Sequence, residues 1–245
     1  MVKIDVKKII FIISCLTIFF LGLFLSVDAA PVNVENTSYT FGSAETRATA
    51  TAGSASVQGG NVTEMNITQV TQTQYWQGFW GQVDYEMRLE DASGNVFYNW
   101  SVAAIQHGEV YFSNNSVLQW DTGLTNSSDA NVSFLQTEFD WANTTSSDSL
   151  SQTYNRANGH QEFNVSLSNG DNLQINRTST AAVNLEGGIF NCTMLWYDTW
   201  ELPIWASIIN PDQTSFNGEA ADFEVLLPVR GPKTAEIYYA FLEIE

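Results

Sequence analysis

The fold class is decided by the stretch Val83-Asp-Tyr-Glu-Met-Arg-Leu-Glu-Asp-Ala-Ser-Gly-Asn-Val-Phe-Tyr-Asn-Trp100. Its first half alternates apolar and charged residues, which is the period-two pattern of a strand with one buried face. The segment Asp91-Ala-Ser-Gly-Asn95 has the composition of a turn, and the alternation resumes over residues 96–104. The stretch therefore predicts a β-hairpin in which Trp100 faces the core and Asn99 faces solvent.

Short apolar segments separated by polar turns recur through the rest of the chain. Strands are expected at residues 108–113, 117–120, 161–167, 173–178, 191–197, 202–209, 222–229 and 236–244. Only residues 131–141 have the composition of a short helix. This pattern predicts an all-β fold, a single β-sandwich or jelly-roll-like domain. The last strand is apolar on both sides, which predicts a central strand or, alternatively, a strand donated to a neighbouring subunit.

The N-terminus has the layout of an export signal. Three lysines precede an apolar run at residues 9–27, and small residues follow it. This layout is typical of a secretory signal peptide, but the run is also about as long as a membrane-spanning helix. Residues 1–30 are therefore expected to be a cleaved signal or a retained signal anchor, and in both cases the rest of the chain lies outside the cell. Residues 31–58, rich in Ser, Thr, Ala and Gly, are expected to be a flexible spacer or an irregular first strand. A β-rich extracellular domain then occupies residues 59–245.

The chain is strongly acidic, with a formal net charge of −18. Removing residues 1–30 takes away three lysines and two aspartates, which leaves six basic and 25 acidic residues and a net charge of −19. Such a charge repels nucleic acid and anionic lipid surfaces, so no nucleic-acid partner is expected. Cys192 is the single cysteine beyond the leader and is expected to be a small buried core residue.

Asn-x-Ser/Thr sequons are more frequent than the composition explains. Chance predicts about four, and eleven occur. They lie at Asn36, Asn61, Asn66, Asn99, Asn114, Asn126, Asn131, Asn143, Asn164, Asn176 and Asn191. A glycosylated asparagine must face solvent, and Asn99, Asn164, Asn176 and Asn191 have the polar parity of their expected strands. Glycosylation of several sites is therefore predicted.

No pattern of catalytic or metal-binding residues stands out. His107 and His160 are the only histidines and are expected in surface turns. The carboxylates are numerous enough to include a glycosidase pair, but spacing along a β-fold names none. Residues 91–95 offer oxygen atoms at alternating positions, as a calcium loop does, but are first of all a hairpin turn. No catalytic residue, cofactor or metal is expected.

Aromatic residues are the remaining candidates for a binding surface. The candidates are Trp76, Trp80 and Trp205. Trp80 has polar parity and Trp205 is out of phase with its apolar neighbours, so both are expected to be exposed. Exposed rings stack on sugars or on partner surfaces. Trp100 and Trp196 have apolar parity and are expected in the core.

Several segments together resemble a family of secreted archaeal cell-surface proteins. They are Trp76-Gln-Gly-Phe-Trp-Gly-Gln-Val83 and Asp91-Ala-Ser-Gly-Asn-Val-Phe-Tyr-Asn-Trp100, with residues 59–67, 108–110, 216–218, 222–223, 225–229 and 238–239. They cover about the first third of the exported domain and its C-terminal end, in the same order. Ala240 departs from the pattern, which has a third aromatic residue there. The resemblance implies an extracellular β-protein without enzymatic activity, and it transfers no catalytic residue.

The sequence thus predicts a non-enzymatic extracellular cell-envelope glycoprotein with a structural or adhesive role. Its expected partners are envelope components or other surface proteins, and the membrane if residues 9–27 are retained. Two alternatives are a carbohydrate- or partner-binding module with exposed aromatic residues, and a surface-filament subunit that donates a strand. A secreted glycoside hydrolase-like enzyme is the remaining alternative.

Overall fold

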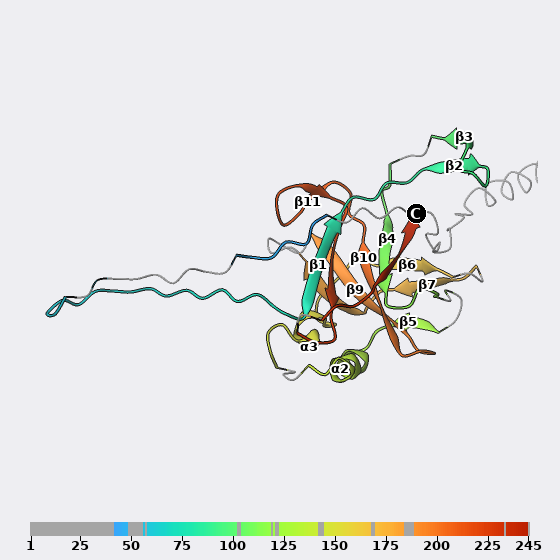
Figure 1. Ribbon diagram of the computed structural model, residues 1–245. Helices are drawn as coiled ribbons and strands as arrows, with labels where there is room; N and C mark the ends of the chain where they lie inside the picture. Colours follow the sequence, from blue (N-terminus) through green and yellow to red (C-terminus); the bar gives the residue numbers. More distant parts are fainter. Residues whose placement is uncertain are drawn as a thin grey trace, which may run out of the picture.

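The computed structural model describes residues 42–48, 56, 58–101, 104–118, 120, 123–141, 145–167, 170–183, 189–232 and 234–244. They form a body of antiparallel sheets from which an extended segment and a β-hairpin project (Figure 1). Strands dominate, and the described residues include only two short helices, so the prediction of an all-β fold is confirmed. The expected leader at residues 1–30 lies outside these residues, and none of their helices is long and apolar enough to cross a membrane.

A six-stranded antiparallel sheet forms the centre of the body. Its strands are β4 (Gly108–Ser113), β5 (Leu124–Asn126), β8 (Ser179–Val183), β9 (Phe190–Tyr197), β10 (Leu202–Ile208) and β14 (Tyr239–Ile244). The order is β14-β4-β10-β9-β5, and β8 also pairs with β9. The middle strands β9 and β10 are buried over nearly their whole length, because both faces of the sheet are covered.

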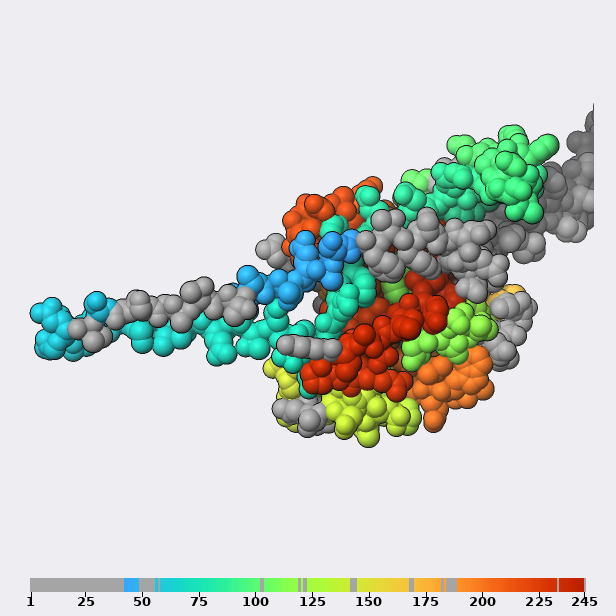
Figure 2. Space-filling view, in the orientation of Figure 1, coloured from blue at the N-terminus to red at the C-terminus, as the bar shows by residue number. Residues whose placement is uncertain are grey.

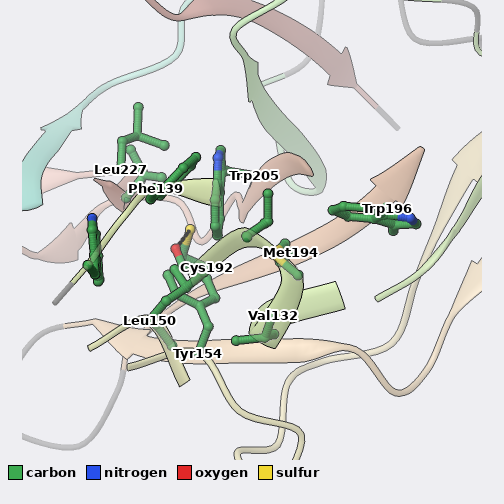
Figure 3. Packing of buried hydrophobic residues seen from close by; sticks show 13 residues of the cluster. Val132, Phe139, Leu150, Tyr154, Cys192, Met194, Trp196, Trp205 and Leu227 are labelled. Atoms are coloured by element: carbon green, nitrogen blue, oxygen red, sulfur yellow. Dashed lines mark hydrogen bonds between the residues drawn. The ribbon is translucent and has the colours of Figure 1, made fainter. Parts of the chain in front are cut away.

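One face of this sheet is covered by strands β1 (Trp76–Gly81) and β13 (Phe223–Pro228) and by helices α2 (Asp129–Glu138) and α3 (Leu150–Thr153). The helix expected at residues 131–141 is present, but it begins at Asp129 and ends at Glu138. Figure 3 shows the core under this layer, where Tyr154 points toward Cys192 and lies near Trp205. The Tyr154 hydroxyl is within hydrogen-bonding distance of Cys192 Sγ (2.7 Å) and of the Leu226 carbonyl oxygen (2.8 Å). Cys192 is fully buried, as the sequence predicts.

The other face is covered by a second hairpin, formed by β6 (Phe163–Ser166) and β7 (Asn172–Ile175). Phe163, Val165 and Ile175 from this hairpin belong to one apolar cluster with Tyr111 and Phe241 from the central sheet. The sequence predicts this hairpin, and the structure confirms it. A short ribbon of β11 (Gln213–Thr214) and β12 (Ala220–Ala221) completes the body.

The hairpin expected from the deciding stretch is present as β2 (Met87–Glu90) and β3 (Val96–Trp100). Its place in the fold differs from the expectation. It stands away from the body (Figure 1), and every residue of both strands is exposed. Trp100 is 44 % exposed, so the prediction that it belongs to the core is wrong. The alternation identified a strand pair, but the described part of the chain has no second layer over its apolar face.

The C-terminal strand β14 also differs from the expectation of a central strand. It pairs with β4 alone and forms an edge of the central sheet. Phe241 and Glu243 are buried beneath the β6–β7 hairpin, whereas Tyr239 is 41 % exposed. The β6–β7 hairpin covers one face of β14, and this layer is enough to bury its apolar side chains. A paired strand on each edge is not needed for that burial.

Candidate functional site

Two glutamates face each other across the edge of the central sheet. Glu109 on β4 is the direct register partner of Glu243 on β14, so both side chains lie on the same face. Each residue is only 2 % exposed. Carboxyl groups are rarely this deeply buried, because leaving water costs free energy that neighbouring groups must offset. The pair therefore needs neighbouring polar groups that stabilise it.

Hydrogen bonds from two other elements hold Glu243. The Tyr111 hydroxyl donates to Glu243 Oε2 at 2.6 Å, and the Ser166 amide donates to Oε1 at 2.9 Å. One carboxyl group thus joins β14 to β4 beside it and to β6 above it. Edge strands are the least constrained part of a sheet, so these bonds help to fix the C-terminal strand.

A small hollow lies at the same end of the sheet. Its volume is about 100 Å³, and it is lined by His107, Gly108, Glu109, residues 161–164, Ile208 and Ile209. Pockets for small molecules are typically ~300–1,000 Å³, so this hollow has room for water rather than for a sugar chain. The described residues contain no group of three or more His, Cys, Asp or Glu side chains placed to hold a metal ion.

The two histidines lie at or near the surface of the described body. His107 is exposed at the rim of the hollow, and His160 is half-buried with Nδ1 2.8 Å from the Gln161 carbonyl oxygen. A glycosidase pair needs two carboxyl groups that reach a substrate. Glu109 and Glu243 are almost fully buried, and both Glu243 oxygens accept internal hydrogen bonds. The arrangement suits a structural polar network better than hydrolysis.

Sequence reasoning missed the glutamate pair. One signal was present: Glu243 interrupts an otherwise apolar C-terminal segment, and Glu109 follows a glycine at the start of a strand. The pairing of β4 with β14 joins distant parts of the chain, and the bond from Tyr111 to Glu243 spans 132 positions. No local pattern reports such a register.

The three tryptophans expected to bind partners lie in different environments. Trp205 is fully buried, so the expectation that it is exposed is wrong. It lies on β10, whose two faces are both covered, and parity along such a strand does not separate core from solvent. Trp76 is half-buried, its Nε1 donates to the Asp148 carbonyl oxygen at 2.7 Å, and its ring stacks on Tyr154. Trp196 is buried, as expected.

Trp80 forms part of an aromatic surface with Phe216. Trp80 is half-buried on β1 rather than exposed as expected, and its ring meets the Phe216 ring edge-on at a centroid distance of 5.8 Å. Phe216 is 67 % exposed. Its amide donates to Glu224 Oε1 at 2.7 Å, and burial raises the pKa of that carboxyl. Two adjoining rings at the surface can stack on a flat apolar ligand face. A binding role for Trp76 and Trp80 stays a prediction.

The structure describes nine of the eleven sequon asparagines; Asn36 and Asn143 lie outside the described residues. The exposed ones are Asn61, Asn66, Asn99, Asn164 and Asn176. The half-buried ones are Asn114, Asn126, Asn131 and Asn191. Two half-buried carboxamides have structural partners: Asn126 Nδ2 donates to the Gln174 carbonyl oxygen at 3.2 Å, and Asn131 forms the capping box of α2 with Ser128. The five exposed asparagines are therefore better acceptors for glycans than the half-buried ones.

The turn between β2 and β3 is stabilised by Asp91. Its carboxyl accepts hydrogen bonds from the Asn95 side chain (2.7 Å) and from the Asn95 and Ser93 amides (both 2.9 Å). These donors, with the Asn95 side chain first, lower the pKa of Asp91. Gly94 has a φ of +78°, which favours glycine. The interpretation of residues 91–95 as a hairpin turn is confirmed.

Comparison with known proteins identifies no relative of this chain. No protein-family model, curated protein or solved structure matches the chain. The resemblance to archaeal surface proteins therefore stays a prediction.

Proposed function

We propose that this protein is a non-enzymatic extracellular glycoprotein of the cell envelope with a structural or adhesive role. The observation that carries the proposal is the exposure of five sequon asparagines, of which Asn164 lies on a strand whose apolar residues Phe163 and Val165 point to the other side. The acidic charge of the chain, −18, favours a soluble surface that repels nucleic acid and anionic lipid.

The test is the intact mass of protein purified from the cells that make it. Glycosylation predicts a mass above that of the polypeptide, and replacing the exposed asparagines Asn99, Asn164 and Asn176 by Gln should remove part of the excess. Asn126→Gln is the matched control, because the Asn126 carboxamide already bonds to Gln174. A mass equal to the bare polypeptide would refute the proposal. The same spectrum shows whether residues 1–30 remain attached.

A second candidate function is recognition of carbohydrate or of a partner surface by the rings of Trp80 and Phe216. It is favoured by the edge-on contact of these rings and by the exposure of Phe216. Binding to a glycan array should be lost in both Trp80→Ala and Phe216→Ala. Trp200→Ala changes a tryptophan of 38 % exposure elsewhere and should leave binding unchanged. An array without any bound glycan would remove the carbohydrate form of this candidate.

A further inference from the structure

The projecting β2–β3 hairpin has an uncovered apolar face. Met87 pairs with Trp100, and Leu89 pairs with Tyr98, so these four side chains share one side, here called the hairpin face. Their exposed fractions are 44 % for Met87, 50 % for Leu89, 55 % for Tyr98 and 44 % for Trp100. Together they expose on the order of 400 Å², the size of the patches that form interaction sites.

The hairpin also has too few strands to be stable alone. A two-stranded hairpin is marginal in water, and a third strand or a packed layer is usually needed. Among the described strands, β2 and β3 pair only with each other. On the opposite side, Arg88 forms ion pairs with Glu86 and Glu90, and Phe97 is 83 % exposed. Among the described strands, the outer edges of β2 and β3 are therefore free to pair with a further strand.

The second uncovered element is the extended segment of residues 58–74, here called the arm. It is exposed along its whole length and carries four apolar side chains. These are Val62 (102 % exposed), Met65 (72 %), Ile67 (79 %) and Val70 (62 %). Its backbone forms no hydrogen bond with any other described residue. Thr73, which donates to Asp148 Oδ2 at 2.9 Å, holds the base of the arm on the body.

We propose that the arm of one copy of this chain adds as a third strand to the hairpin of a second copy, with Met65 and Ile67 placed beside Tyr98 and Trp100 so that they extend the hairpin face. The arm leads into β1 and the hairpin follows β1, and the two project from different sides of the body (Figures 1 and 2). The two surfaces are different, so the contact is heterologous and repeats from copy to copy. Repetition without closure gives an open chain of subunits, and closure gives a ring; this inference rests on the structural role proposed above.

Charge selects the edge of the hairpin that receives the arm. β3 contains no charged residue, whereas β2 contains Arg88 and Glu90, and charges on an edge strand oppose strand addition. The arm itself has a single charged residue, Glu64. Pairing of the arm with β3 therefore joins two nearly uncharged segments of molecules that otherwise repel each other.

The sequons leave this contact free. Asn66 lies between Met65 and Ile67, and Asn99 lies between Tyr98 and Trp100. Successive side chains of a strand point to opposite faces, so both asparagines point away from the shared apolar layer. A glycan on Asn66 or Asn99 then covers the outer side of the three-stranded sheet.

Two single-site variants test the contact in sedimentation velocity experiments. Ile67→Asp disables the arm, and Tyr98→Asp disables the hairpin face. We expect the wild-type protein to form concentration-dependent chains, and each variant alone to associate at least tenfold more weakly. An equimolar mixture should form dimers, because Ile67→Asp retains an intact hairpin and Tyr98→Asp retains an intact arm. Val117→Asp, which charges an exposed apolar residue outside both elements, should assemble as the wild type does.

A wild-type protein that stays monomeric would overturn the inference, as would a mixture of the two variants that does not dimerise. Binding of phosphatidylcholine vesicles that depends on Tyr98, without self-association, would also overturn it and assign a lipid surface to the hairpin face. Near-UV circular dichroism checks the body of each variant, and Ile67→Ser or Tyr98→Ser replaces any variant that fails to fold. Failure of this test is distinct from failure of the proposed function, which is judged by glycan mass.

Discussion

Removal of the Tyr111 hydroxyl tests the buried network that fixes the C-terminal strand. Tyr111 is fully buried, and its hydroxyl donates to Glu243 Oε2 at 2.6 Å. Tyr111→Phe keeps the ring and its contact with Trp120, whose centroid lies 5.0 Å away. The change therefore removes one hydrogen bond and leaves a buried carboxyl oxygen without that donor. Such bonds contribute about 0.5–1.5 kcal/mol for neutral acceptors and about 1.5–3 kcal/mol for charged ones. We expect the free energy of unfolding to fall by about 2 kcal/mol.

Urea denaturation followed by tryptophan fluorescence measures this loss. With a slope of roughly 2 kcal/mol per M, the unfolding midpoint should fall by about 1 M. Tyr239→Phe is the matched control, because Tyr239 lies on the same strand as Glu243 and is 41 % exposed; its free energy of unfolding should stay within about 0.5 kcal/mol of the wild type. Equal stabilities of the two variants would show that the hydroxyl does not stabilise β14, and would refute the reasoning.

Three further changes test other parts of the fold. Trp205→Ala should cost about 3–5 kcal/mol in urea denaturation because it empties a fully buried site, and Trp80→Ala should cost clearly less; equal costs would contradict these positions. Burial raises the pKa of Cys192 to about 12, so the native thiol should resist iodoacetamide until the protein unfolds. The contribution of the protonated Cys192 thiol to the free energy of unfolding should be constant below about pH 8.5. It should be lost as the pH rises toward 12, because the thiol of the unfolded chain releases its proton at a lower pH. Labelling of the native protein by iodoacetamide near neutral pH would contradict the burial of Cys192. Gly108→Ala should disrupt the pairing of β4 with β14, since a Cβ there would overlap the Glu243 carbonyl oxygen and φ is +145°. Gly94→Ala has open space around it and should cost only about 1–2 kcal/mol of backbone strain, so equal Tm values for the two glycine variants would count against this account.

Local patterns along the chain predicted much of the secondary structure. Turn chemistry at Asp91 and Gly94 located the projecting hairpin, and the alternation around Asn164 located the β6–β7 hairpin with its outward sequon. These features depend on residues a few positions apart, whose hydrogen bonds and side-chain directions follow from the backbone geometry of a strand and a turn. The single helix expected near residue 131 was found for the same reason.

The sequence by itself determined the all-β class, the acidic charge and the outward side of several sequons, because each depends on composition or on local alternation. Tertiary structure alone decided which strands have two covered faces and which have none. Trp205 is buried because β10 lies between two layers, and Trp100 is exposed because no described layer covers the hairpin face. The opposition of Glu109 and Glu243 likewise depends on pairing between distant strands. Alternation of apolar and polar residues indicates that the two sides of a strand differ. Which side is buried depends on the elements that pack against the strand.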